Sequence, residues 1–422
     1  MDDQLLAPAM YRASVRFADD AIADLPAAIA DALDRGRLRP EPGSRIAVAV
    51  GSRGIHALDR IVRTTVDWLR ARGAVPFIVP AMGSHGGATA EGQAEVLASY
   101  GITERTMGVP VRSSMETVRL DSDGLDLDLF MDRNAWEADA VLLVNRVKPH
   151  TDFHGFPESG LLKMSVIGLG KHAQALAVHG RGIRGLKEFI LPAARRILAT
   201  GRILGGLAVV ENAWDRTMRV QAAPADGIEP MERDLLSLAA TTMARLPLDR
   251  IDVLIADEMG KDVSGTGLDT NVIGRIRILG EAEPAAPVIR SILVSRLTAA
   301  SHGNAIGVGL ADVITRELYD AIDFAATYEN GLTSSFSERV KIPYVAPDHA
   351  AAVRAALRFA GLHPDPAVIR ERARIVRVRN TLELSSLVVS AAAAEALRGT
   401  ADVEIDAEPL PLLEAGRLAP WR

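Results

Sequence analysis

Residues 45–87 read RIAVAVGSRGIHALDRIVRTTVDWLRARGAVPFIVPAMGSHGG, and their pattern indicates the class of fold. Arg45 to Val50 and Ala74 to Val79 are short apolar runs, and each is followed by a glycine-rich loop. The segment between them repeats apolar residues at helical spacing, and a further helix is expected from about Thr89 to just before Gly101. Alternating strands and helices are typical of βαβ units, so we expect an α/β fold with mostly parallel sheets.

A chain of 422 residues is long enough for two or three domains. We expect an N-terminal α/β domain over 1–260, a C-terminal α/β domain over 261–396, and a segment 397–422 that packs back on the first domain. Each domain should hold a mostly parallel sheet flanked by helices, with the active site in the cleft between them. Strands of the second domain are expected at Ile276–Leu279, Ile292–Val294, Ile306–Val308 and Ile375–Val378.

The composition excludes several classes of function. Cysteine is absent, which rules out disulfides, thiolate metal sites and cysteine nucleophiles. The net charge of -6 and the lack of a basic run disfavour nucleic acid as a partner. The N-terminus lacks the pattern of a signal peptide, and no apolar run approaches bilayer length, so we expect a cytoplasmic protein that does not bind membranes.

The richest concentration of reactive side chains lies in residues 145–180, NRVKPHTDFHGFPESGLLKMSVIGLGKHAQALAVHG. The stretch comes directly after Ala140 to Val144, an apolar run that reads as a buried strand. In an open α/β sheet, ligands bind where loops leave the carboxyl ends of strands. Histidines and lysines clustered in such a loop indicate the active site. Its histidines and lysines are His150, His154, His172, His179, Lys148, Lys163 and Lys171.

Spacing alone does not specify the reaction. Any one histidine taken alone is at least as readily explained by a hydrogen-bonded structural role as by a catalytic or metal-binding role. The two glycine loops are also explained by tight turns before capped helices, although such turns can bind anions. Neither HExxH nor GxSxG is present, which disfavours a standard zinc hydrolase and a serine hydrolase. The residues indicate a histidine-rich α/β enzyme with an anion site, and the candidates are Arg53, His85, His150, His154, Lys163, Lys171, His172, His179 and Lys261.

The chain resembles the nickel-dependent lactate racemase family over nearly its whole length, and the resemblance is strongest in three motifs. They are GSRG (51–54), GSHGG (83–87) and the stretch from Lys148 to His179. The family has a lysine followed sixteen positions later by a histidine, and Lys163 and His179 keep this separation. The resemblance implies that Lys163 carries a nickel-pincer nucleotide, a pyridinium mononucleotide bound through a thioamide. It also implies that His179 completes the coordination of the nickel.

The resemblance further implies a racemase or epimerase of a 2-hydroxy acid. Hydride would leave C2 of the substrate and return to the other face, while His85 and His150 exchange the hydroxyl proton; His154 is the alternative to His150. Arg53 would hold the substrate carboxylate, with Lys261 as a second cation. Residues that would surround the cofactor are Ser52, Gly54, Ser84, Gly86, Gly87 and His154.

Two positions depart from the family pattern. Val50 stands where the family often has an aspartate, and Gly86 stands where an arginine usually comes after the histidine. Both lie around the substrate, so we expect the same chemistry on a 2-hydroxy acid other than lactate. Expected partners are this substrate and the enzymes that make the cofactor, and a homo-oligomer is left open. Lys171 and His172 are equally consistent with a cofactor phosphate contact and with a surface position.

Two other functions remain as alternatives. One is a metal-dependent hydrolase or lyase in which His85, His150 and His179 bind the ion directly. The other is a binding protein that uses the glycine loops for a phosphorylated or carboxylated ligand.

Overall fold

The structure, a computed structural model, describes residues 8–51, 54–362 and 365–421. Its contacts divide the chain into two compact units. We name each unit after its larger sheet. The five-strand unit spans Ala18 to Met243, and the eight-strand unit combines the chain up to Phe17 with the chain from Ala244 onward. Each unit has its own sheet and its own hydrophobic core. The expected α/β class with mostly parallel sheets flanked by helices is confirmed.

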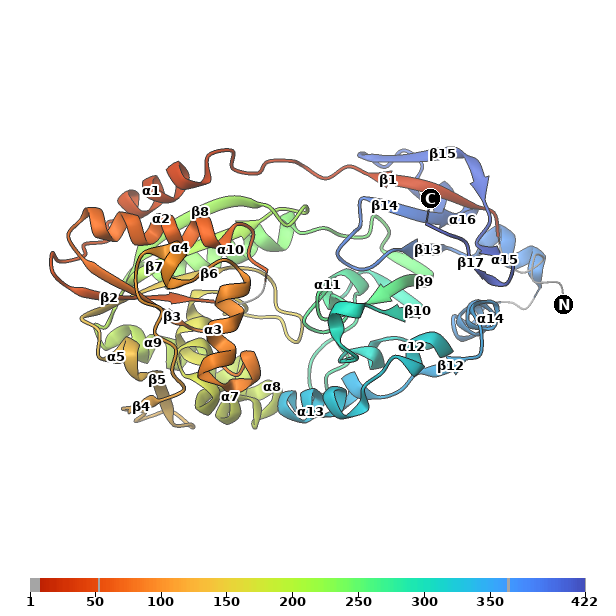
Figure 1. Cartoon of the computed structure of the whole chain (residues 1–422). Helices are drawn as coiled ribbons and strands as arrows, with labels where there is room; N and C mark the ends of the chain where they lie inside the picture. Colours follow the sequence, from red (N-terminus) through yellow and green to blue (C-terminus); the bar gives the residue numbers. More distant parts are fainter. Residues whose placement is uncertain (1–7, 52–53, 363–364, 422) are drawn as a thin grey trace. The chain divides into compact units, whose positions relative to one another are not determined.

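The five-strand unit is built around a sheet of order β3-β2-β6-β7-β8 (Figure 1). The strands β2, β3, β6 and β7 are parallel, and β8 is antiparallel to β7. A separate hairpin pairs β4 with β5. The strands of this unit are β2 (Arg45–Val50), β3 (Val75–Pro80), β4 (Thr117–Leu120), β5 (Leu129–Asp132), β6 (Ala140–Arg146), β7 (Ile203–Glu211) and β8 (Thr217–Pro224).

The helices of this unit include two π-helical turns, at 164–168 and 185–189. Short 3-10 turns lie at Gly86–Ala88 and Ala225–Gly227. The α-helices are α1 (Leu25–Arg35), α2 (Leu58–Ala71), α3 (Ala90–Ser99), α4 (Glu104–Met107), α5 (Arg133–Trp136), α6 (Leu161–Lys163), α7 (Lys171–His179), α8 (Gly182–Arg184), α9 (Ile190–Ala199) and α10 (Ile228–Thr242).

Local sequence explains where these helices begin. Asp24 accepts a hydrogen bond from the Ala27 N–H and caps α1, and Thr89 caps α3 through the Gly92 N–H. The apolar side of α2, including Ile61, Val62 and Leu69, packs in one core cluster with α1 and with side chains of β2. Buried aliphatic strands between helices are typical of parallel sheets, and they fix β2 and β6 at the centre of the unit.

The eight-strand unit has a sheet of order β12-β11-β10-β9-β13-β14-β1-β15. The five strands from β12 to β13 are parallel, and β14, β1 and β15 continue the sheet with antiparallel pairs. A two-stranded ribbon pairs β16 with β17. The strands are β1 (Met10–Val15), β9 (Arg250–Met259), β10 (Val288–Leu297), β11 (Val313–Thr315), β12 (Tyr344–Ala346), β13 (Ile375–Val378), β14 (Ser386–Ser390), β15 (Val403–Leu410), β16 (Leu413–Glu414) and β17 (Arg417–Leu418).

The helices of the eight-strand unit are short, and several begin at an Asp, Ser or Thr cap. Within the part of the chain that the structure describes, no helix is long and apolar enough to cross a membrane. The α-helices are α11 (Thr270–Ile273), α12 (Arg316–Asp320), α13 (Phe324–Ser334), α14 (His349–Phe359), α15 (Pro366–Arg372) and α16 (Ala391–Leu397), and 3-10 turns lie at Ala299–Ser301, Val308–Leu310 and Ser337–Val340.

The unit boundaries differ from the expected domains 1–260, 261–396 and 397–422. The division lies between Met243 and Ala244, because β9 pairs with β10 and β13 inside the eight-stranded sheet. The first strand, β1, belongs to the same sheet through its pairing with β14. Residues 403–410 form β15, which pairs with β1 in the eight-strand unit, so the C-terminal segment completes that unit. Long-range strand pairing places both ends of the chain, and local pattern does not reveal such pairing.

Local predictions agree best where an apolar run is a central strand. The predicted strand Arg45–Val50 coincides with β2, and Ile375–Val378 coincides with β13. By contrast, Ile276–Leu279 and Ile306–Val308 are not strands. Their isoleucines are buried in loops, and the Ile276 N–H donates to a Glu283 carboxylate oxygen instead of to a sheet. A short buried apolar run therefore indicates burial more reliably than it indicates a strand.

A buried ion pair links two strands of the eight-strand unit. The Arg377 guanidinium donates two hydrogen bonds of 2.7 Å to the Asp257 carboxylate, and both side chains are buried. We expect Arg377→Leu to lower the free energy of unfolding by about 3–5 kcal/mol, because it leaves Asp257 buried without its counter-ion. Urea unfolding checks this value.

The control for this variant is Arg16→Leu, in the exposed pair Arg16–Glu404 of the same unit. That substitution should cost less than about 1 kcal/mol. Equal losses from the two substitutions would contradict the importance of burial.

Candidate functional site

The candidate site lies at the carboxyl ends of β3, β2 and β6. The connection from β2 leads through α2 to β3 on one side, whereas β6 is followed by β7 on the other side. The gap between β2 and β6 is therefore a topological switch point, where ligands bind in open α/β sheets. Parallel pairing brings the loops after Val50, Pro80 and Arg146 to this edge. The three motifs singled out from the sequence begin in these loops.

Close packing and hydrogen bonds connect the three loops. A Cβ on Gly51 would lie 2.5 Å from Asn145 Oδ1, so only glycine fits there without displacing Asn145. Asn145 in turn donates from Nδ2 to the Gly160 carbonyl at 3.0 Å. The loop after β3 is held by the Gly83 N–H, which donates to the Gly168 carbonyl at 3.2 Å. The segment that carries Lys163 is thus connected to the loops after both neighbouring strands.

Lys163 and His150 meet at this edge. Lys163 is the last residue of α6, its side chain is partly exposed, and Nζ contacts Nε2 of His150. The main-chain N–H of Asp152 donates to the other ring nitrogen, Nδ1, at 3.0 Å. A π-helical turn, a feature often found at functional sites, begins directly after Lys163. The structure therefore brings together two of the predicted site residues, thirteen positions apart in the sequence.

The buried carboxylate of Glu158 organises the histidine loop. It accepts hydrogen bonds from the His150 N–H at 2.6 Å and from the Gly155 N–H at 3.0 Å. One of its oxygens also lies 3.5 Å from Nδ1 of His154. A backbone bridge between Lys148 and Ser159 closes the base of the loop. One glutamate thus fixes the positions of both loop histidines.

A second buried glutamate lies behind Lys163. Glu232 of α10 accepts a hydrogen bond from the Leu162 N–H at 3.0 Å, at the start of the helix that carries Lys163. A Cβ on Gly160 would collide with this carboxylate. Burial raises the pKa of Glu232 to about 7, and its hydrogen bonds from Leu162 and Leu161 oppose this rise only in part.

Lys171 is buried, so the structure does not place it on the surface. Its Nζ lies 3.1 Å from Asp132 Oδ2 and donates to the Pro80 carbonyl and to Gln93 Oε1. Burial lowers the pKa of Lys171 and raises the pKa of Asp132, and their mutual attraction opposes both changes. Gln93 donates onward to the carbonyls of Gly83 and His85. Lys171 therefore supports the loop that carries His85.

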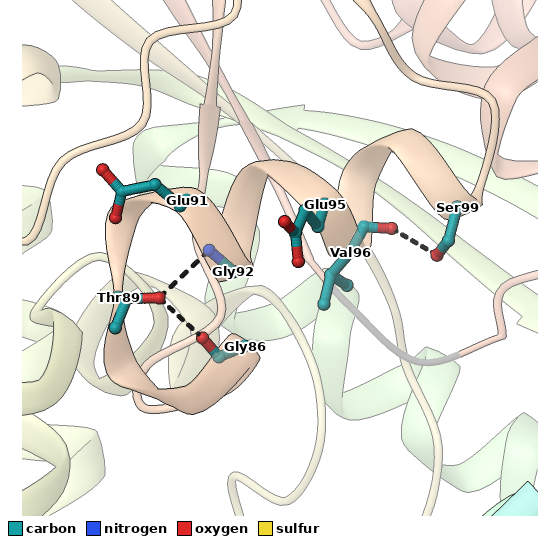
Figure 2. A pocket seen from close by; sticks show the side chains of 7 residues that line it. All are labelled: Gly86, Thr89, Glu91, Gly92, Glu95, Val96 and Ser99. Atoms are coloured by element: carbon teal, nitrogen blue, oxygen red, sulfur yellow. Dashed lines mark hydrogen bonds between the residues drawn. The ribbon is translucent and has the colours of Figure 1, made fainter.

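The loop of His85 borders a surface cavity of about 550 Å³ along α3 (Figure 2). Thr89 donates to the Gly86 carbonyl and accepts from the Gly92 N–H, so this helix N-terminus is already capped. The carboxylates of Glu91 and Glu95 disfavour a phosphate in the cavity. The cavity is thus a poor fit to the predicted anion site. Its lining residues are Gly86, Thr89, Glu91, Gly92, Glu95, Val96 and Ser99.

The remaining predicted residues have different surroundings. Arg53 and Ser52 lie outside the described residues. The Gly54 N–H donates to the Tyr100 hydroxyl at 3.4 Å, so it is not reserved for a ligand. In the GSHGG loop, Ser84 and Gly86 are partly exposed and Gly87 is exposed.

The two remaining predicted residues lie at the end of a helix and in the other unit. His179 is the last residue of α7, which packs against the π-helical turn after Lys163. Lys261 is an exposed residue of the eight-strand unit, in the loop after β9, where its N–H donates to Ser301 Oγ. It therefore belongs to a different unit from the other described candidates.

Sequence patterns did not identify Glu158, Glu232 and Asn145. Glu158 lies inside the histidine stretch, where a carboxylate among imidazoles is a usable signal. Glu232 lies 69 residues after Lys163 in an amphipathic helix, and its periodicity does not distinguish it from a surface residue. Among the residues that the structure describes, no three His, Asp or Glu side chains are grouped to hold a metal ion. The direct histidine-bound metal of the hydrolase alternative gains no support from this arrangement.

The raised pKa of Glu232 predicts a pH-dependent stability. The folded protein favours the neutral form of Glu232. The stability that this protonated side chain contributes is therefore fully present below pH 4.5, the ordinary pKa, and is lost as the pH rises through about 7. We expect Glu232→Gln, which keeps the acceptor for Leu162, to remove this dependence, worth about 3 kcal/mol across that window. Urea unfolding between pH 4.5 and 8 measures the difference.

Glu229→Gln on the same helix is the matched control. Arg195 lowers the pKa of Glu229 through hydrogen bonds, so this substitution should matter above the ordinary pKa and lose its effect on acidification. Parallel pH profiles for wild type and Glu232→Gln would show that Glu232 does not titrate in this window.

Comparisons with known proteins give only distant likenesses. No protein-family model and no curated protein matches the chain. A structural-genomics protein from Thermotoga maritima is 12% identical, with a TM-score of 0.48, over 66% of this chain and 72% of that chain. The lactate racemase apoprotein from Thermoanaerobacterium thermosaccharolyticum is 13% identical, with a TM-score of 0.45, over 87% of this chain and 88% of that chain. With both TM-scores below 0.5, neither likeness assigns a function to this chain.

Proposed function

We propose that the chain is a racemase or epimerase of a 2-hydroxy acid that uses a nickel-pincer nucleotide carried on Lys163. The observation that supports this most is the contact between Lys163 and His150 at the switch point of the five-stranded sheet. An amine that ends a short helix, next to an imidazole and among glycine-rich loops, suits the attachment of a cofactor. The motifs shared with the nickel-dependent lactate racemase family add the expected chemistry.

The residues present fit this cofactor. Lys163 is partly exposed, as a tether must be, and the chain has no cysteine that would compete for the nickel. The cofactor would bring its own sulfur and carbon ligands, so the protein needs to add one imidazole, proposed to be His179. When bound, the nickel-pincer nucleotide supplies a hydride acceptor for the C2 hydrogen of the substrate.

The acid and base of the proposed reaction are two histidines. His85 is held by the network of Gln93 and Lys171, and the main-chain contacts of its loop fix its position. For the second histidine, His154 is better supported than His150. Nδ1 of His154 faces the Glu158 carboxylate, which would orient the ring and increase its basicity, whereas Nε2 of His150 is engaged by Lys163. Arg53 remains the proposed clamp for the substrate carboxylate, and Lys261 the proposed second cation.

Removing the tether tests the proposal. Co-expressed with the enzymes that make the cofactor, the wild-type protein should carry an adduct on Lys163 and about one nickel per chain. Lys163→Ala should carry neither and should lack racemase activity, because the carbon–nitrogen bond cannot form. Intact mass, peptide mapping and nickel quantification on the same sample provide the measurement.

Lys187→Ala is the control, since Lys187 is an exposed lysine of a π-helical turn in the same unit. It should keep the adduct and the nickel. Full activity of Lys163→Ala, or an adduct on another lysine in the wild type, would refute the proposed tether.

Removing a base should separate chemistry from cofactor binding. We expect His85→Asn to retain the adduct and the nickel but to lower the rate of racemisation by about 10²- to 10⁴-fold, the usual contribution of general acid–base catalysis. Chiral chromatography of a panel of 2-hydroxy acids measures this rate. His302→Asn is the control, because His302 is exposed in the other unit at a left-handed position that asparagine tolerates. Equal activity of both variants would remove His85 from the mechanism.

A further inference from the structure

We propose that His150 holds the Lys163 side chain as an unprotonated amine at neutral pH, ready to condense with a carbonyl or thiocarboxyl carbon. The inference rests on the proposed function only for the identity of the cofactor. The reactivity of the Lys163 amine is a property of the protein without cofactor. His150 is then a positioning residue for Lys163, which leaves His154 to face the substrate.

The hydrogen bonds of the imidazole determine which nitrogen carries the proton. The Asp152 N–H donates to Nδ1 at 3.0 Å, so Nδ1 presents its lone pair and carries no hydrogen. A neutral imidazole then carries its proton on Nε2, which is the atom that contacts Lys163 Nζ. An ammonium group has no lone pair with which to accept this hydrogen. The contact is therefore satisfied when Lys163 is a neutral amine.

The surroundings hold the ring in this orientation. The Glu158 carboxylate accepts a hydrogen bond of 2.6 Å from the main-chain N–H of His150, and the Phe153 ring lies 4.6 Å from the imidazole, centroid to centroid. Phe153 is buried, so one side of the ring is shielded from water. A donor fixed in place opposite Nζ disfavours a proton on the amine, because hydrogen bonding to the neutral form stabilises that form.

Several ionisable groups surround this pair. Asp152 Oδ2 is 3.8 Å from Nδ1, too far for a hydrogen bond, and the Asp152 N–H occupies that nitrogen instead. Glu158 is engaged by two main-chain N–H groups and lies next to His154. Glu232 faces the backbone at the start of α6 from α10. The main-chain N–H of Asp152 and the side-chain carboxylate of Glu158 thus fix the loop, and neither places a proton on the ring.

The proposed reaction is a balanced condensation. The Nζ lone pair forms a carbon–nitrogen bond, the carbon–oxygen bond breaks, and the oxygen leaves as water. With an aldehyde both hydrogens of the water come from the amine, whereas with a thiocarboxylic acid one comes from the amine and one from the acid. An aldehyde gives an imine, and a thiocarboxylic acid gives a thioamide. Neither product requires an oxidant or a reductant.

Trace reductive methylation of the protein without cofactor tests the inference. Formaldehyde and cyanoborohydride modify only unprotonated amines, and peptide mass spectrometry resolves each lysine. An ordinary lysine with a pKa of about 10.4 is almost entirely protonated at pH 7. We expect Lys163 to react at least about ten-fold faster than the exposed Lys187 at pH 7, with a weaker pH dependence between pH 7 and 10.

Substitution of His150 shows whether the ring causes the reactivity. In His150→Ala the rate at Lys163 should fall to that of Lys187, whereas His150→Gln, which keeps an N–H donor, should retain most of it. Lys171 reports on folding in every sample, since this fully buried lysine stays unmodified while the unit is folded. If Lys171 becomes modified in His150→Ala, that variant has unfolded and cannot be used. The comparison of wild type with His150→Gln and the pH profile of the wild type then show whether His150 causes the reactivity of Lys163.

Two results would overturn the inference. One is a wild-type Lys163 that reacts no faster than Lys187, and the other is an equally fast Lys163 in wild type and His150→Ala. Failure of the proposed function has a different signature, namely no adduct and no nickel after co-expression despite a fast Lys163. An adduct on a Lys163 that shows no enhanced reactivity would instead support the proposed function and reject the role of His150.

Discussion

Parallel pairing of β2 with β3 and β6 is the constraint on which the candidate site depends. It aligns the carboxyl ends of three strands at one edge, so that loops from residues 51, 81 and 147 onward emerge side by side. The middle of each strand is buried and mostly aliphatic, and the candidate reactive groups lie beyond the carboxyl ends of the strands. The sheet thus provides a rigid support, and the loops provide the reactive groups.

Buried polar groups convert this edge into a fixed geometry. Glu158 fixes the histidine loop, Glu232 accepts from the helix that ends in Lys163, and Lys171 with Gln93 supports the loop of His85. Each of these side chains engages main-chain groups, which is how buried polar atoms offset the cost of leaving water. The network explains why these residues are buried although they are charged or polar. None of them needs to touch a substrate for the site to depend on them.

Predictions of central strands from the sequence agreed with the structure, whereas the predicted domain boundary did not, and the difference has a physical reason. Strands such as β2 and β13 were predictable because a short aliphatic run bounded by polar residues has few alternatives in a parallel sheet. The domain boundary was not, because β1 and β15 join the eight-stranded sheet by pairing across almost the entire length of the chain. In the same way, Lys171 could not be distinguished from a surface lysine until Asp132 was found beside it.

The amino-acid sequence was enough to predict the α/β class, the glycine loops and the concentration of histidines and lysines after the strand that ends near Arg146. These are local properties, since strand pattern, turn chemistry and residue type are written in adjacent positions. The contact of His150 with Lys163, the binding of Glu158 to the His150 main chain and the His154 ring, and the place of Glu232 behind the proposed tether are properties of the folded chain. Such contacts depend on how loops and helices return to one edge of a sheet, and periodicity along the chain carries no record of that return.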